Sequence, residues 1–121
     1  MTLEANFTPT TQGTGASQLQ VFVSRVETTT RVVLAGELDG ASALPLAEQL
    51  SDVASDLVGD LVVDIGLLTF IDSTGLSLLL SLQEMARASG RPLIISDPTP
   101  MARRLFQITG LDQRLRIEPA P

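Results

Sequence analysis

The residues best suited to chemistry form the run Asp72-Ser73-Thr74-Gly75, which opens an apolar segment of helical length. A continuous apolar stretch precedes it, so the pattern predicts a hydroxyl at the start of a helix, beside a carboxylate. The sequence contains no His, no Cys and no Lys, so the usual general bases and activated nucleophiles are missing. We therefore expect no catalytic residue and interpret Ser73 as a group that another protein modifies.

The position of Ser73 allows two interpretations. A helix N-terminus offers unpaired N–H groups and a partial positive charge, so a phosphoryl group added there gains hydrogen bonds. Asp72 opposes the same modification by charge repulsion. In the alternative interpretation, Ser73 only caps its helix, a role for which Ser is favoured.

Helical spacing divides the segment 73–89 into two faces. The apolar face comprises Gly75, Leu78, Leu79, Leu82, Met85 and Ala86. The opposite side carries Ser73, Ser77, Glu84 and Arg87, with Leu80 among them and Leu76 at the border. An exposed Leu80 beside a modifiable Ser would form a small docking patch for a partner, although solitary surface leucines are common.

Three carboxylates, Asp39, Asp64 and Asp72, fall at or near predicted strand ends. Strand ends gather at one edge of a parallel sheet, where carboxylates can bind a divalent cation or work as an acid–base pair. Their spacings match no metal motif, and Asp is common at turns. We expect no metal site and no cofactor.

Composition limits the partners. The 121 residues carry a net charge of −6, and all eight basic residues are Arg. This balance argues against nucleic acid and against anionic membranes, which are bound largely through positive charge. The chain has no apolar run of about 18 residues and no secretory signal pattern. We expect a cytoplasmic protein.

The elements that position these residues follow from periodicity and turn residues. We expect a flexible tail over residues 1–17 and one domain over 18–121. Strands are predicted at 19–26, 29–38, 61–65, 92–96 and 114–117. Helices are predicted from an N-cap at Ser42 to Gly59, with Pro45 in the first turn, from 73 to 89, and from an N-cap at Thr99 to Gly110. The first helix has its apolar face at Leu46, Leu50, Val53 and Leu57.

This order of elements predicts an α/β fold. Three strand–helix–strand crossovers require a mostly parallel sheet, and the short link between the first two strands indicates an antiparallel edge hairpin. We expect a mixed sheet of about four to five strands flanked by about three to four helices.

Four motifs together resemble the STAS domain of bacterial anti-sigma factor antagonists, over about residues 20–118. They are Leu34-Ala35-Gly36-Glu37-Leu38-Asp39, Leu61-Val62-Val63-Asp64, Phe70-Ile71-Asp72-Ser73-Thr74-Gly75-Leu76, and Ala102-Arg103-Arg104-Leu105-Phe106 with Thr109-Gly110-Leu111-Asp112. The resemblance implies a mixed sheet flanked by helices, in agreement with the predicted order.

The resemblance also implies a mechanism. Ser73 would be the phosphoacceptor, and the kinase would be the anti-sigma factor itself. The unphosphorylated protein would bind that anti-sigma factor and free a sigma factor for transcription, and a serine phosphatase would reverse the modification. The partner surface implied is Asp39, Asp72, Ser73, Thr74 and Gly75, to which the helix pattern adds Leu76, Ser77 and Leu80.

Two other functions remain open from the sequence. A STAS subunit of an ABC lipid-transport complex would dock constitutively on its ATPase, and Leu44-Pro45-Leu46 and the apolar run 76–82 favour it slightly. Such subunits often place Thr directly after the Asp, so Ser73 counts against it. A small hydrolase would have to work with Asp and Ser alone.

Overall fold

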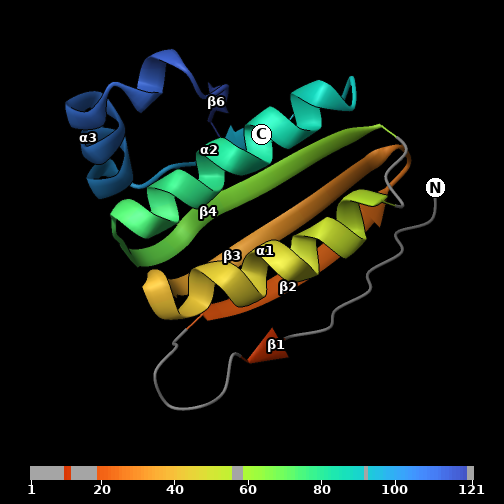
Figure 1. Cartoon of the computed structure of the whole chain (residues 1–121), viewed down its shortest axis with the longest axis horizontal. Helices are drawn as coiled ribbons and strands as arrows, with labels where there is room; N and C mark the ends of the chain where they lie inside the picture. Colours follow the sequence, from red (N-terminus) through yellow and green to blue (C-terminus); the bar gives the residue numbers. More distant parts are fainter. Residues whose placement is uncertain (1–9, 12–18, 56–58, 92, 120–121) are drawn as a thin grey trace.

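The computed structural model describes residues 10–11, 19–55, 59–91 and 93–119. In chain order the elements are β1 (Thr10–Thr11), β2 (Leu19–Val26), β3 (Thr29–Leu38), α1 (Gly40–Ser55), β4 (Asp60–Ile71), α2 (Ser73–Ala88), β5 (Leu93–Ser96), α3 (Pro100–Thr109), the 3₁₀ helix η1 (Leu111–Gln113) and β6 (Ile117–Glu118). The α/β architecture predicted from the sequence is confirmed (Figure 1).

The strands form one mixed sheet in the order β1-β2-β3-β4-β5-β6. The pairs β1–β2 and β2–β3 are antiparallel, and β3–β4, β4–β5 and β5–β6 are parallel. The expected edge hairpin is therefore present as β2–β3. The two-residue strand β1 adds a pairing where the sequence predicts only a tail, and the rest of residues 1–17 lies outside the described residues.

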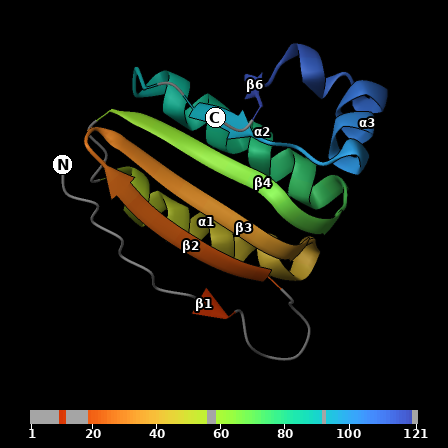
Figure 2. The same ribbon diagram turned by 180° about the vertical axis from the view of Figure 1, so that it is seen from behind.

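Helices α1 and α2 lie side by side on one face of the sheet, and in the reverse view the strands stand in front of them (Figure 2). The core between these layers is aliphatic apart from Phe106, and its fully buried members include Leu34, Leu46, Val63 and Leu79. Each crossover advances one strand along the sheet, so sequence order and spatial order coincide. This arrangement places the starts of α1 and α2 next to each other. Among the described residues, no helix is long and apolar enough to cross a membrane.

Strand β4 runs to Ile71, whereas the continuous apolar stretch in the sequence predicts a strand over residues 61–65 only. The spacing of its buried residues changes along the strand from two positions to three. These residues are Leu61, Val63, Ile65, Leu68 and Ile71. The register with β3 shifts at the same places, between Val33 and Ala35 and between Gly36 and Glu37. Each shift adds one residue to β4, which is the signature of a β-bulge.

The boundaries of the last helix are confirmed. Thr99 is the N-cap of α3, and its hydroxyl accepts a hydrogen bond from the Ala102 N–H at 3.1 Å. Pro100 occupies the first helical turn, where its missing N–H costs little. Gly110 ends the helix with a φ of 78°, a left-handed conformation that favours glycine.

The first helix and the last strand differ from the prediction. Helix α1 begins at Gly40, so Pro45 lies in its second turn rather than its first. Of the apolar face predicted for α1, Leu46 and Leu50 are buried, while Leu57 lies outside the described residues. The last strand is limited to Ile117–Glu118, because Arg114 has a helical backbone conformation at the end of η1.

Candidate functional site

The candidate site lies where β3 and β4 end. Leu38 and Ile71 are register partners at the carboxyl ends of these parallel strands. Asp39 directly follows β3, and Asp72 directly follows β4. The Asp72 N–H donates to the Leu38 carbonyl at 3.2 Å. The two carboxylates predicted to share an edge are therefore placed there by adjacent strands.

Asp72, not Ser73, caps helix α2. Asp72 has extended backbone angles, and its Oδ1 accepts a hydrogen bond from the Gly75 N–H at 2.9 Å. Ser73 is the first helical residue, and its side chain is exposed. Among the described residues no group hydrogen-bonds to the Ser73 hydroxyl. The interpretation that Ser73 serves only as a cap is wrong, because its neighbour satisfies the helix terminus instead.

Helix α1 begins in a similar way at Asp39. Its Oδ1 accepts hydrogen bonds from the N–H groups of Ala41 and Ser42, both at 3.1 Å. The Ser42 hydroxyl accepts from the Asp39 N–H at 2.9 Å and is fully buried. The prediction that Ser42 is the N-cap is therefore wrong. Each side chain thus accepts a hydrogen bond from the backbone N–H of the other residue, and the Ser42 hydroxyl also donates to Asp39 Oδ1 at 3.2 Å, so the Asp39 carboxylate is occupied at the start of α1.

Of the two glycines at these helix starts, only Gly75 is needed for close packing. A Cβ on Gly75 would lie 2.7 Å from the Leu38 carbonyl oxygen and 3.0 Å from Ile71 Cγ1. A Cβ on Gly40 would lie 4.0 Å from the Thr74 hydroxyl. Gly75 is thus required for close packing of α2 on the end of β3, whereas the space next to Gly40 is open.

The partner surface predicted from the sequence is divided by burial. Ser73, Thr74 and Ser77 are exposed and present three hydroxyls along the first turns of α2. Leu76 is only 5% exposed, and Gly75 is also buried, so both support the site from beneath rather than contribute surface.

Leu80 also differs from the expectation. It is half-buried and packs against the core, so it does not form the exposed docking patch predicted for it. Met85, predicted on the buried face, is 48% exposed. Beyond the first turn, the apolar surface of α2 is therefore smaller at Leu80 and larger at Met85 than helical spacing indicates.

Two exposed apolar residues near the site were missed by sequence reasoning. Leu44 is 68% exposed on the second turn of α1, and Phe70 is 45% exposed at the end of β4. A helical wheel would have revealed Leu44, because it points away from Leu46 and Leu50. Phe70 could not be found in this way while the strand was expected to end at residue 65. Contiguous exposed apolar patches mark protein-binding sites, whereas single exposed apolar residues are common, so Leu44 and Phe70 add apolar surface without defining a site by themselves.

Asp64 does not join the other two carboxylates. It lies inside β4 and forms an ion pair with Arg31 on the neighbouring strand, with side-chain exposures of 15% and 31%. Its other oxygen accepts from the Gly66 N–H at 2.8 Å. The expectation that Asp64 belongs to the strand-end group is wrong, because the strand continues past it. In the described part of the chain, no group of three or more acidic side chains is placed to hold a metal ion.

Comparison with known proteins identifies the family of this chain. The family model described as "Mlab, STAS domain" matches residues 21–118. The anti-sigma-B factor antagonist of Staphylococcus aureus is 31% identical over 97 residues, which cover 76% of this chain and 90% of the relative.

Solved structures give the same result. The anti-sigma factor antagonist SpoIIAA in its unphosphorylated form has a TM-score of 0.71 and 25% identity, covering 84% of this chain and 88% of that one. The phosphorylated form of SpoIIAA, a Bacillus cell fate determinant, has a TM-score of 0.66 and 25% identity, covering 84% and 91%. The chain therefore belongs to the STAS domain family, and the Staphylococcus aureus relative and SpoIIAA are named as an anti-sigma-B factor antagonist and an anti-sigma factor antagonist.

Proposed function

We propose that this protein is an anti-sigma factor antagonist that binds an anti-sigma factor when Ser73 is unmodified and releases it when Ser73 is phosphorylated. The observation that carries the proposal is the exposed Ser73 hydroxyl, left free of the capping role by Asp72. Relatives whose names state this antagonist role support it, as does the solved phosphorylated form of SpoIIAA.

The phosphoryl group must come from a partner. With no His, Cys or Lys, the chain lacks the usual bases for activating its own serine. In the proposed reaction, a kinase binds ATP and accepts the proton of Ser73 while the Ser73 oxygen attacks the γ-phosphorus and ADP leaves. By family resemblance the kinase is the anti-sigma factor, and a serine phosphatase hydrolyses the phosphoserine. The chain then acts as a regulator and not as an enzyme.

The location of Ser73 explains how one modification changes binding without unfolding the protein. A phosphoserine at the first helical position meets the unpaired N–H groups of the first turn, which stabilise negative charge. It adds about 1.5 to 2 negative charges beside the Asp72 carboxylate. Those charges must be desolvated when a partner covers Ser73, Thr74 and Ser77. A tenfold loss of affinity needs only about 1.4 kcal/mol, which is below the cost of burying such a charge without a new partner.

Titration calorimetry against the anti-sigma factor encoded nearest to this gene tests the proposal. Ser73→Ala should keep the wild-type affinity, and Ser73→Glu should bind at least about tenfold more weakly. Ser81→Glu is the matched control, because it adds the same charge to an exposed position of the same helix. Incubation with the partner and ATP should add one phosphoryl group to the intact mass of the wild type and none to Ser73→Ala.

Equal affinities for all of these variants would refute the switch. If the protein binds the ATPase of an ABC lipid transporter, and Ser73→Glu leaves that affinity unchanged, the accessory-subunit function is favoured instead. Phosphorylation that persists in Ser73→Ala and disappears in Thr74→Ala would move the modification to the neighbouring hydroxyl.

A further inference from the structure

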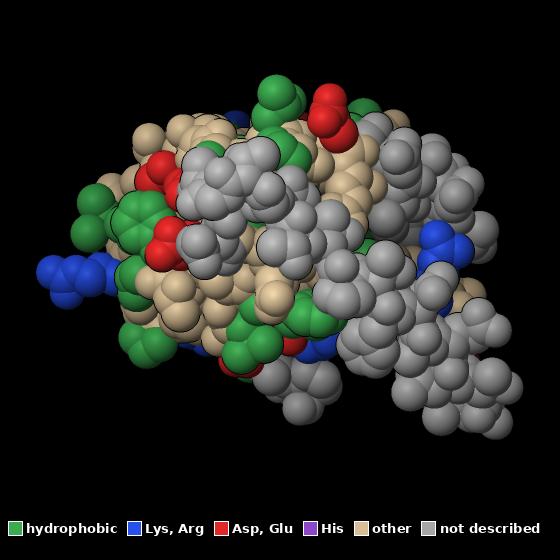
Figure 3. All heavy atoms as spheres, turned by 90° about the horizontal axis from the view of Figure 1, so that it is seen from below, with side chains coloured by type: hydrophobic (Ala, Val, Ile, Leu, Met, Phe, Trp, Pro, Cys, Tyr) green, Lys and Arg blue, Asp and Glu red, His purple; other side chains and the backbone are tan. Residues whose placement is uncertain are grey.

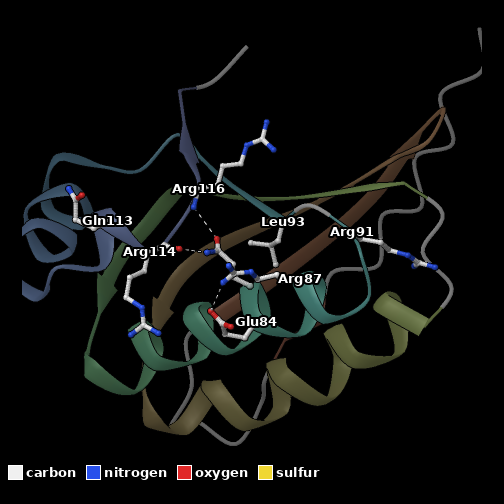
Figure 4. Close-up of a pocket in the computed structure, with 8 residues that line it drawn as sticks. Glu84, Arg87, Arg91, Leu93, Gln113, Arg114 and Arg116 are labelled. Atoms are coloured by element: carbon white, nitrogen blue, oxygen red, sulfur yellow. Dashed lines mark hydrogen bonds and ion pairs between the residues drawn. The ribbon is translucent and has the colours of Figure 1, made fainter.

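A groove of about 540 Å³ lies at the other end of α2 from Ser73. It is bordered by the C-terminal half of α2, the start of β5 and the segment before β6, and four arginines line it: Arg87, Arg91, Arg114 and Arg116 (Figure 4). We call these four residues with their surroundings the arginine groove. Ser73 and Arg87 are 14 positions apart on one helix, which corresponds to about 20 Å, so the groove is separate from the phosphorylation site.

The groove concentrates positive charge on an acidic protein. The whole chain has eight basic and fourteen acidic residues. The lining of the groove contains four of the arginines and one acid, Glu84. Its net charge is therefore +3, and the rest of the chain, with four arginines and thirteen acids, has a net charge of −9. On a face away from the groove, acidic and apolar side chains share the surface, and basic groups lie mostly toward the margins (Figure 3).

The backbone that carries two of the arginines is fixed by Gln83. The Gln83 side-chain oxygen accepts from the Arg116 N–H at 2.9 Å, and its side-chain nitrogen donates to the Arg114 carbonyl. Leu115 between them is only 6% exposed. Because Leu115 anchors this segment in the core, Arg114 and Arg116 project to the surface on either side of it.

The charges of Arg87, Arg114 and Arg116 remain available to a partner. Arg87 and Glu84 are 4.0 Å apart with side-chain exposures of 78% and 49%. Arg116 and Glu118 are 3.1 Å apart with exposures of 58% and 46%. Such exposed pairs contribute little and exchange readily. For Arg114, no carboxylate among the described residues lies within ion-pair distance.

The direction of the side chains decides which anion fits. In Figure 4, Arg91, Arg114 and Arg116 point away from one another around Leu93, and Arg87 lies closer to the centre. Such separated guanidinium groups do not close on one phosphate, but they match carboxylates spaced along an extended segment. A nucleic acid duplex, with one charge per about 1.7 Å, would extend past the groove onto the acidic remainder of the surface.

We propose that the arginine groove is a docking site for a short acidic segment of a protein partner, used independently of Ser73. A fluorescein-labelled oligo-glutamate peptide is the probe, and its anisotropy is measured at low and at physiological ionic strength. The wild type should bind it, with an affinity that falls as salt rises, and an oligo-glutamine peptide should not bind. Arg114→Gln with Arg116→Gln should weaken binding by about fivefold to tenfold.

The matched control is Arg103→Gln with Arg104→Gln, which removes two exposed charges from α3. It should change the affinity by less than about twofold. Ser73→Glu should also leave it unchanged, because the added charge is about two Debye lengths away at 0.1 M salt. Equal losses in the two double variants would overturn the proposal, since they would show a response to net charge alone. A single-stranded oligonucleotide of equal charge that binds more tightly than the peptide would overturn the choice of occupant.

Discussion

Replacing Gly75 with Ala tests how closely α2 must approach the end of β3. The new Cβ would lie 2.7 Å from the Leu38 carbonyl oxygen, 2.9 Å from Leu38 Cγ and 3.0 Å from Ile71 Cγ1. The nearest of these atoms belongs to the backbone and accepts the hydrogen bond of the Asp72 N–H. Relief of the clash must therefore move the helix or the strand end, and both carry the candidate site.

Two opposing effects set the magnitude. Overpacking of this kind costs about 1–3 kcal/mol. Ala is favoured over Gly inside a helix by about 1 kcal/mol, and the gain is smaller in the first turn, where helical hydrogen bonds are incomplete. We expect a net destabilisation of about 1–2 kcal/mol, which lowers the Tm by roughly 4–10 °C for a domain of this size.

Urea unfolding followed by far-UV circular dichroism measures this change. The chain contains no Trp and no Tyr, so tryptophan emission is absent and protein concentration must come from refractive index. Gly40→Ala is the control, because it makes the same substitution at the start of the neighbouring helix, with only the Thr74 hydroxyl at 4.0 Å. It should lie within about 0.5 kcal/mol of the wild type or be slightly more stable. A Gly75→Ala variant as stable as Gly40→Ala would refute the close-approach argument.

Two further predictions concern the polar groups around the sheet. Asp72→Ala should lower the free energy of unfolding by about 1 kcal/mol. Asp72→Asn keeps an oxygen that can accept from the Gly75 N–H, so its free energy of unfolding should fall by less. Equal urea midpoints for both variants would show that the cap is not the stabilising feature. A double-mutant cycle with Arg31→Met and Asp64→Asn should give a coupling energy of about 1 kcal/mol, because the pair is only partly exposed; a coupling near zero would mean that this ion pair contributes nothing to stability.

The order of strands and helices could be predicted from the sequence because each relied on local signals. Thr99 with Pro100, and Gly110 at the other end, define α3 by chemistry that acts within one turn. The parallel crossovers then follow from alternation of the element types. The exposure of Ser73 also agrees with its predicted place on the polar side of α2.

The errors have a common physical origin. Which of two neighbouring polar residues caps a helix depends on where the preceding strand ends, and that end was set by tertiary pairing. Asp39 and Asp72 became the caps because β3 and β4 end together at Leu38 and Ile71. The strand predicted to end at residue 65 continues to Ile71, and two bulges change the period of its buried side chains beyond Ile65. The arginine groove joins α2 to a distant segment, as the hydrogen bond between Gln83 and Arg114 across 31 positions illustrates, so no local pattern could reveal it.

The two bulges in β4 have a consequence for changes in chain length. Each inserted residue reverses which face the following side chains occupy, and the second reversal undoes the first. Ile71 therefore points inward again, and the serine that follows Asp72 reaches solvent. Removal of one residue between Gly66 and Thr69 should turn this serine toward the interior, whereas removal of two should restore its orientation. Changes in the number of residues in this part of β4 during evolution or redesign are thus expected to occur in even steps.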